Sequence, residues 1–261
     1  MITRRGLFAL PALAAFAADR KERLIAQTYI FQQQNKAAAE VFATVKEAGF
    51  RAVELMPAFA GADSNGVEVE IAYSGGSMED ALAVAAKTGA KAVNYNPDPK
   101  PKRERKSDEE LASQADRVNR VGRALRDRGQ RLLLHHHDAE MADHAREWRY
   151  MLSSTDPALV GICVDCHWAW RGGQNYMDMV RAAGARLESL HLRNSVAGVW
   201  SESLGPGDVD YAPLEEYLRG SRLTPYLVVE LAYESGTRVT RPLADNLRMS
   251  REYVSSLFRV T

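Results

Sequence analysis

The segment VGICVDCHW, residues 160–168, is one of four apolar runs that each end in side chains able to bind a metal ion. The other three are LLLHHHDAE (132–140), LESLHLRN (187–194) and YLVVEL (226–231). An apolar run of about four to eight residues is typical of a buried strand, and helical patterns separate these four. Strands that alternate with helices pair in parallel, in a sheet covered on both faces. The sequence therefore predicts an α/β fold, a single (β/α)8 TIM barrel.

The remaining elements follow the same alternating order. Expected strands cover 23–31, 51–56, 67–73 and 91–95, and the four quoted segments supply the other four. Expected helices cover 36–48, 77–87, 107–128, 139–152, 175–183, 213–219 and 242–257. Ser77 with Asp80, and Ser107 with Glu110, have the spacing of N-terminal capping residues. Because no stretch has the composition of a linker, residues 23–261 are expected to form one domain.

The composition limits the class of partner. Of the 261 residues, 46% are hydrophobic and 26% are charged, and 34 Lys plus Arg balance 34 Asp plus Glu. This is an ordinary globular composition at the length of one barrel. With no net charge, the chain has no overall field that would attract nucleic acid or an anionic membrane. We expect a small-molecule substrate and no nucleic-acid partner.

The N-terminus has the features of an export signal. Arg4 and Arg5 precede an apolar stretch that ends at Ala17, and residues 15–17 (AFA) form a small-x-small cleavage site. This pattern resembles a twin-arginine signal peptide covering residues 1–17. Its apolar core is too short to span a bilayer, and the alternative is an amphipathic N-terminal helix. We expect a periplasmic or extracytoplasmic protein that is free of the membrane after cleavage.

Two cysteines, Cys163 and Cys166, are spaced C-x-x-C in a predicted strand. A disulfide must be considered in an exported protein. Side chains alternate along a strand, however, so these two thiols would point to opposite faces. We predict two free, buried thiols, with Cys163 on the same face as Asp165 and one layer deeper in the barrel.

Four polar residues at the strand ends are expected to meet in space. All strand C-termini of such a barrel open on one rim, which would bring together Glu140, Asp165, His191 and Glu230. Three carboxylates and an imidazole at one point would repel one another unless a divalent cation lay between them. Plainer roles exist, because Asp165 could cap the following helix and Glu230 could pair with Arg193. One shared metal site explains all four at once.

The order of these motifs resembles the xylose isomerase-like TIM barrels, many of which are called sugar phosphate isomerase/epimerase. The resemblance covers residue 23 to the end of the chain. Its matching segments are His135-His136-His137-Asp138-Ala139-Glu140, Val164-Asp165-Cys166-His167-Trp168, His191-Leu192-Arg193-Asn194, Gly205-Pro206-Gly207-Asp208-Val209-Asp210 and Val228-Val229-Glu230. It implies that Glu140, Asp165, His191 and Glu230 bind one divalent ion.

The identity of that ion depends on the ligand from the fifth strand. Oxygen ligands with one imidazole suit Mn²⁺, the ion we expect, or Mg²⁺. The site would be more favourable for Zn²⁺, Co²⁺ or Fe²⁺ if His135 also binds the ion. Many relatives carry a glutamate at the place of His135, so the ligand is either His135 or Glu140. We favour Glu140, with His135 behind the ligands or in contact with substrate.

Further side chains are expected to contact the substrate. Trp168 would form a wall against the apolar face of a sugar, and Arg193 would stabilise negative charge. The alternatives are packing roles for His167 and Trp168 and a surface role for Glu54. The full set of expected substrate-binding residues is His135, His137, His167, Trp168, Arg193 and Glu54.

The chemistry implied by the resemblance is a metal-dependent sugar isomerase or epimerase acting on a keto or hydroxy sugar. Glu140 and Glu230 would remove and return a proton on two sides of the metal, through a metal-stabilised enediolate. Loss of a β-substituent at the same site would make the protein a dehydratase or lyase. A periplasmic sugar-binding barrel without chemistry is a further alternative, and neutral charge disfavours an apurinic endonuclease. Relatives often form dimers or tetramers, so a homo-oligomer remains open.

Overall fold

The computed structural model describes residues 23–97 and 104–260 of the chain. The export signal predicted for residues 1–17 lies outside the described residues. Across the described ranges, no helix is both long enough and apolar enough to cross a membrane.

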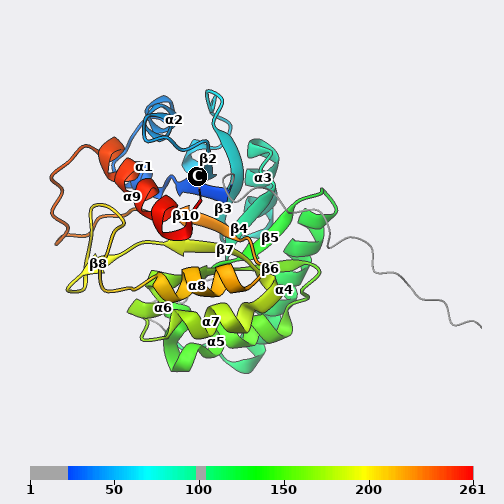
Figure 1. Ribbon diagram of the computed structural model, residues 1–261. Helices are drawn as coiled ribbons and strands as arrows, with labels where there is room; N and C mark the ends of the chain where they lie inside the picture. The colour runs from blue at the N-terminus through cyan, green and yellow to red at the C-terminus, as the bar shows by residue number, and fades with distance from the viewer. Residues whose placement is uncertain (1–22, 98–103, 261) are drawn as a thin grey trace, which may run out of the picture.

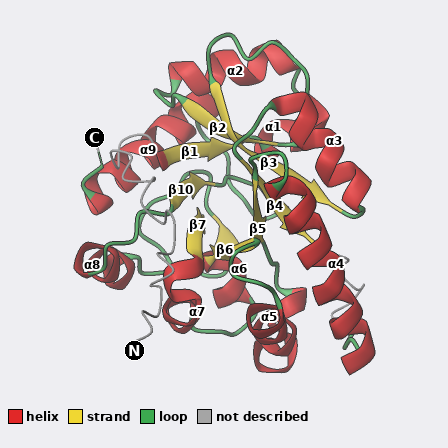
Figure 2. Ribbon diagram, turned by 90° about the vertical axis from the view of Figure 1, so that its right-hand side faces the viewer, coloured by secondary structure: helices red, strands yellow, loops and turns green. Residues whose placement is uncertain are grey.

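Eight parallel strands close into a barrel, and a ring of helices surrounds them (Figures 1 and 2). Strand β10 pairs with β1 through Ile25 and Val228, which closes the barrel. The predicted fold class is therefore confirmed. The strands, in sequence order, are β1 (Leu24–Gln27), β2 (Ala52–Leu55), β3 (Glu68–Gly75), β4 (Ala92–Asn96), β5 (Arg131–Leu134), β6 (Val160–Asp165), β7 (Leu187–Leu192) and β10 (Tyr226–Val229).

The helices bury their apolar faces against the outside of the barrel. The two predicted capping pairs are confirmed, because Ser77 Oγ accepts the N–H of Asp80 (3.1 Å) and Ser107 Oγ accepts the N–H of Glu110 (3.2 Å). The helices are α1 (Tyr29–Gln33), α2 (Ala38–Glu47), α3 (Met78–Thr88), α4 (Asp108–Arg126), α5 (Ala142–Ser154), α6 (Cys166–Arg171), α7 (Tyr176–Ala183), α8 (Ala212–Gly220) and α9 (Leu243–Phe258). Short 3-10 turns cover Pro57–Phe59, Ala139–Met141 and Gly184–Arg186.

Two predicted elements differ from the structure, and one element of the structure was not predicted. The strand expected at 23–31 ends at Gln27, and α1 follows it, because an apolar run alone does not distinguish a strand from a short buried helix. Cys166 begins α6 instead of continuing the strand, since the carboxylate of Asp165 caps that helix. A small antiparallel pair, β8 (Ser195–Val196) with β9 (Val199–Trp200), was not predicted. Both cysteines are free and buried, as predicted.

The barrel interior has an apolar layer beneath a polar one. Side chains alternate along each strand, so every second residue points inward. The apolar layer packs as a cluster separate from the main core between the barrel and its helices. It consists of Ile25, Ala52, Ile71, Ala92, Leu133, Cys163 and Val228.

The loop after β7 is fixed by the side chain of Asn194. Its Oδ1 accepts the N–H groups of Ser195 (3.0 Å) and Val209 (2.9 Å), and its Nδ2 donates to the carbonyl of Gly205 (2.9 Å). This brings Gly207 so close that a Cβ there would overlap the carbonyl oxygen of Ser195 and lie 2.7 Å from Asn194 Cγ. The loop therefore requires glycine at 207 for space.

We expect Gly207→Ala to lower the free energy of unfolding by about 1–3 kcal/mol, the usual cost of overpacking. Gly205→Ala is the matched control in the same loop, because nothing lies within 4 Å of a Cβ built there. Urea unfolding of the two variants measures the difference. Equal stabilities would contradict the close approach.

Candidate functional site

Each barrel strand places one polar side chain near its C-terminal end, in the barrel interior. Seven of these residues follow a residue of the apolar layer by two positions, which is the period of a strand, and His191 follows buried Ser189 in the same way. The eight residues, hereafter the polar ring, are Gln27, Glu54, Tyr73, Asn94, His135, Asp165, His191 and Glu230.

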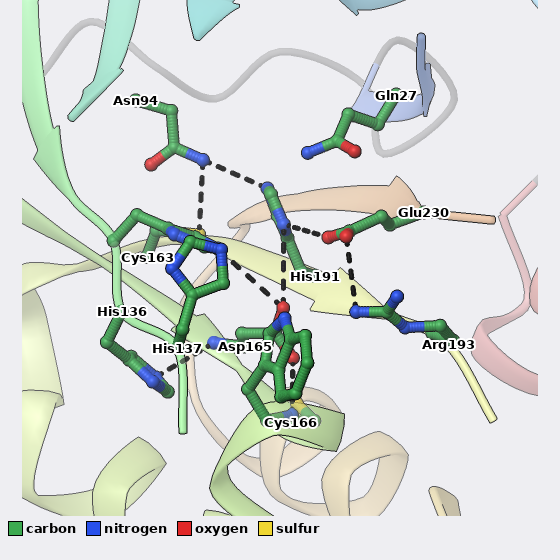
Figure 3. Close-up of polar contacts among 12 residues, drawn as sticks. Gln27, Asn94, His136, His137, Cys163, Asp165, Cys166, His191, Arg193 and Glu230 are labelled. Atoms are coloured by element: carbon green, nitrogen blue, oxygen red, sulfur yellow. Dashed lines mark hydrogen bonds and ion pairs between the residues drawn. The ribbon is translucent and has the colours of Figure 1, made fainter. Parts of the chain in front are cut away.

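His191 is a member of this ring, and its imidazole lies between two carboxylates. Its Nδ1 is 2.6 Å from Glu230 Oε2, and its Nε2 is 3.0 Å from Glu54 Oε2. Asn94 Nδ2 lies 2.9 Å from the same Nε2, and Figure 3 shows the imidazole between Asn94 and Glu230. Burial alone would lower the pKa of His191, but neighbouring Cys163, Glu54 and Glu230 raise it well above its ordinary value.

Four residues of the ring form a compact group of donor atoms. His135, Asp165, His191 and Glu230 each offer one atom, and these atoms lie within 4.8 Å of one another. Asp165 Oδ2 is 3.7 Å from His135 Nε2 and 3.8 Å from His191 Nδ1. Asp165 also caps α6, because its Oδ1 accepts the N–H of Trp168 (2.7 Å). Its capping role and its place in the group therefore coexist on two different oxygens.

Buried atoms without partners mark the space between these residues. Both ring nitrogens of His135, and Asp165 Oδ2, find no hydrogen-bond partner among the described residues. Such atoms cost about 1–3 kcal/mol each when they stay unpaired. Burial and the charge of Glu230 also raise the pKa of Asp165. A cation between Asp165 and Glu230 would relieve the repulsion between these two carboxylates. The donor set of two imidazoles and two carboxylates fits one divalent ion.

Glu140 lies outside this group, contrary to the ligand set expected from the sequence. It is part of the 3-10 turn after β5, and its Oε2 accepts the backbone N–H of His137 (2.8 Å). His135 takes the place in the group, because it follows inward-facing Leu133 by one strand period. Burial raises the pKa of Glu140 despite the N–H of His137, which lowers it.

The other two histidines of the segment lie outside the group of four: His136 is buried and His137 is half-buried. Burial lowers the pKa of His135 to about 3 and that of His137 to about 4, with His191 and His135, respectively, adding to the effect. Both are therefore neutral at pH 7 and can offer a lone pair. His137 Nδ1 lies 2.9 Å from Asn96 Nδ2. His136 has a structural contact, since its Nε2 accepts the N–H of Asp165 (3.1 Å).

Aromatic rings and Arg193 form the wall next to Glu230. The guanidinium carbon of Arg193 lies 4.2 Å from the ring centre of Trp200 and 5.2 Å from that of Trp168. Its Nη2 is 3.2 Å from Glu230 Oε1, so the ion pair considered from the sequence is present. Arg193 is only 2% exposed, and within the described chain its Nε has no hydrogen-bond partner. Arg193 is therefore positioned to donate to a bound molecule.

His167 is fixed in one tautomer by a chain of hydrogen bonds. The hydroxyl of Ser195 donates to Asp208 Oδ2 (2.7 Å), so its oxygen must accept from His167 Nε2 at 3.0 Å. Burial lowers the pKa of His167 to about 4, with Arg193 adding to the effect. The neutral ring therefore carries its proton on Nε2 and leaves Nδ1 as an acceptor.

Glu54 differs most from the roles considered for it. It is fully buried, which rules out the surface alternative. Its carboxylate accepts from Gln27 Nε2 (2.9 Å) and Asn94 Nδ2 (3.1 Å) and contacts His191. With an ion on Nδ1 of His191, Nε2 would donate its proton to Glu54, a partner that fixes the orientation of a ligating imidazole.

Several residues of the site were missed by the sequence analysis. Gln27, Tyr73 and Asn94 carry a signal in the sequence, because each lies two positions after an inward-facing apolar residue. Trp200 carries none, because its place against Arg193 depends on the β8–β9 hairpin.

We expect His135→Ala to abolish retention of a divalent ion and Glu140→Gln to preserve it, since only His135 lies in the group of four. His136→Ala is the control for the loss of a buried ring from the same segment. Metal analysis of the three purified variants, after reconstitution with Mn²⁺, measures the difference. If only the Glu140→Gln variant lost the ion, Glu140 would be the ligand, as expected from the sequence.

We expect Glu54→Gln to weaken Mn²⁺ binding about 10- to 100-fold, because the proton acceptor of His191 Nε2 is lost. Glu70→Gln is the matched control: Glu70 is also buried on a strand, but it contacts Lys91 (2.6 Å) and Tyr226 (2.7 Å). The control should lose stability and keep its Mn²⁺ affinity in calorimetric titration. An unchanged affinity in Glu54→Gln would leave Glu54 a purely structural role.

Solved structures share this fold over nearly the whole chain. A sugar phosphate isomerase/epimerase from Parabacteroides distasonis has a TM-score of 0.71 at 15% identity, with 96% of this chain and 98% of that chain covered. An L-ribulose 3-epimerase has a TM-score of 0.71 at 14% identity, with coverage of 90% and 94%. A probable 3-DHS dehydratase from Bacillus anthracis has a TM-score of 0.69 at 13% identity, with coverage of 89% and 98%. At these identities the likeness concerns the fold alone.

Sequence comparison gives relatives and a family. An inosose dehydratase from Clostridium perfringens is 23% identical over 166 residues, which are 57% of this chain and 55% of that protein. The chain thus spans about half the length of the curated relatives that it matches. The model of the family described as xylose isomerase-like TIM barrel matches residues 43–254. The chain therefore belongs to the xylose isomerase-like TIM barrel family.

Proposed function

We propose that the protein is a divalent-metal-dependent isomerase or epimerase that acts on a keto or hydroxy sugar or a derivative of one. The observation that carries the proposal is the group of four, in which unpartnered atoms of His135 and Asp165 face His191 and Glu230. Mn²⁺ is the ion we expect, with Mg²⁺, Co²⁺, Zn²⁺ and Fe²⁺ as alternatives. The family of the chain, and the names of the solved structures that share its fold, support a sugar substrate.

The proposed ion and the protein side chains have separate tasks. A divalent ion held by the group of four would polarise the substrate carbonyl and acidify the neighbouring C–H. Burial alone would raise the pKa of Glu230, but Arg193 and His191 hold it well below its usual range. Glu230 therefore stays ionised and can accept the proton. The free N–H of Arg193 would donate to the substrate oxygen on which charge develops.

The return of the proton needs a second group. Glu140 is the candidate, because burial raises its pKa and a carboxyl group with a raised pKa suits a proton donor. Burial and the charges of Glu230, Glu54 and Glu140 raise the pKa of the Tyr73 phenol, so Tyr73 stays protonated at neutral pH. Delivery to the same carbon would give an epimer, and delivery to the neighbouring carbon would give an isomer.

A dehydratase is the second candidate, and two observations favour it. The curated relatives carry the name inosose dehydratase. Glu140 also lies outside the group of four, and elimination of a β-hydroxyl needs only one base beside the metal. Glu230 would then remove the proton, and an acid of the polar ring or its surroundings would protonate the departing hydroxyl.

The place of action is proposed from the N-terminal sequence alone. The paired arginines and the cleavage site of residues 1–17 support export by the twin-arginine route. That route would deliver the barrel to the periplasm or another extracytoplasmic compartment.

The test is exchange of substrate hydrogen in heavy water. We expect the Mn²⁺-loaded chain to incorporate deuterium next to the carbonyl of at least one member of a panel of ketoses and inososes, measured by NMR. The product distinguishes the candidates, since an epimer or isomer keeps every oxygen of the substrate and differs in mass only by the exchanged deuterium, whereas a dehydratase product has lost water.

Glu140→Gln separates the two reactions further. If Glu140 returns the proton, the variant should keep its ion but lose about 10²- to 10⁴-fold in epimerisation, the usual weight of one acid–base group. The rate of an elimination in which Glu230 removes the proton should fall less in this variant. A chain that binds Mn²⁺ and promotes neither exchange nor water loss would instead be a sugar-binding barrel without chemistry.

A further inference from the structure

A cysteine lies directly beneath the polar ring. Cys163 is fully buried in the apolar layer of the barrel interior, two residues before Asp165 on β6. Its Sγ, one nitrogen of His135 and one nitrogen of His191 lie within 4.8 Å of one another. This second group shares both histidines with the group of four, but it contains a thiol in place of the two carboxylates.

The two groups face opposite edges of one imidazole. Nδ1 of His191 faces Glu230 at 2.6 Å, on the side of Asp165. Nε2 faces Asn94 Nδ2 at 2.9 Å, and that amide nitrogen lies 3.7 Å from Cys163 Sγ. Figure 3 shows both contacts of Asn94 and the contact of the opposite edge with Glu230. A ligand on the Nε2 edge would therefore lie deeper in the barrel than one on the Nδ1 edge.

The residues around this edge carry buried oxygens that have no hydrogen-bond partner in the described chain. Gln27 Oε1, Asn94 Oδ1 and Ser189 Oγ are buried and have no hydrogen-bond partner in residues 23–97 and 104–260. Glu54 adds a carboxylate 3.0 Å from Nε2 of His191. Unpartnered oxygens, a carboxylate, a thiol and two imidazoles are the surroundings of a cation rather than of an apolar molecule.

We propose that His135, Cys163 and His191 form an inner metal position for a thiophilic divalent ion, of the class of Zn²⁺, Co²⁺ or Cd²⁺. Thiolate and imidazole donors suit these ions, whereas Mn²⁺ and Mg²⁺ prefer oxygen. On binding, Cys163 gives up its thiol proton to solvent and His191 gives up any proton on Nε2. The thiolate and the nearby Glu54 carboxylate together offset the two positive charges.

Occupation of the inner position excludes an ion from the outer one. Both positions need His135 and a lone pair of His191. A neutral imidazole has only one lone pair, so it binds an ion through Nδ1 or through Nε2, and an inner ion leaves only Asp165 and Glu230 for the outer position. A thiophilic ion would thus act as an inhibitor that competes with Mn²⁺. This inference goes beyond the proposed function, because it requires the two histidines and Cys163 but no sugar chemistry.

Titration of the apo full-length chain with Co²⁺ tests the inner position, because thiolate ligation gives an intense near-ultraviolet charge-transfer band that oxygen and nitrogen ligands do not. The chain has two cysteines, so a band that survives in Cys166→Ser arises from Cys163 alone. We expect the band in the wild type and in Cys166→Ser, and its loss in Cys163→Ser. Asp165→Asn, which alters only the outer group, should keep the band.

The outcomes separate the two proposals. Co²⁺ binding without a charge-transfer band, or a band that disappears in Cys166→Ser, overturns the inner position and leaves the proposed function intact. A band together with failure to bind Mn²⁺ supports the inner position and contradicts the proposed function. The spectrum of Cys166→Ser tests the inner position even if Cys163→Ser does not fold. Competition gives a second readout: added Mn²⁺ should reduce the band in the wild type but not in Asp165→Asn.

Discussion

The closure of eight strands into a barrel is the constraint on which the site depends. Every second side chain must point into the barrel, so the last inward-facing residues of the eight strands lie together at one end of the barrel interior. Because these residues are polar and nearly all are buried, their polar atoms need partners inside the barrel, either one another or a bound ligand. His191 shows the result, with one carboxylate at each nitrogen. The strands thus hold several carboxylates close together in a buried space, where they repel one another unless a cation lies between them.

The loops above the barrel complete the site through hydrogen bonds of their own. Asn194, next to Arg193 on the chain, ties the loop after β7 to residues 205–209. The hydroxyl of Ser195 connects that loop to His167, and the β9 residue Trp200 lies over Arg193. One short segment therefore sets both the tautomer of His167 and the position of Arg193. A disturbance of this loop would shift Arg193 and, through the ion pair of Arg193, would reach Glu230.

The sequence predicted the barrel and much of the site, and the misses have physical causes. Buried parallel strands appear as apolar runs, so the four quoted segments located β5, β6, β7 and β10 closely. Asp165, His191 and Glu230 were placed together because each ends such a run. Glu140 was preferred to His135 by resemblance, although counting two residues on from Leu133 leads to His135. The same count reaches Gln27 and Asn94. It does not reach Trp200, whose position depends on a hairpin with only two residues in each strand.

The side chains around the two edges of the His191 imidazole, and not the barrel fold itself, would decide which metal ion binds. The Nδ1 edge faces Glu230 and Asp165, and carboxylates prefer hard ions. The Nε2 edge faces Glu54 and the amide of Asn94, which also contacts Cys163 Sγ, and a thiol prefers soft ions. Glu54 participates on both sides of this choice. It would accept the Nε2 proton when an ion lies at Nδ1, and it would balance charge when an ion lies near Nε2. Under the two proposals, a barrel without Cys163 would bind an ion only at the Nδ1 edge of His191.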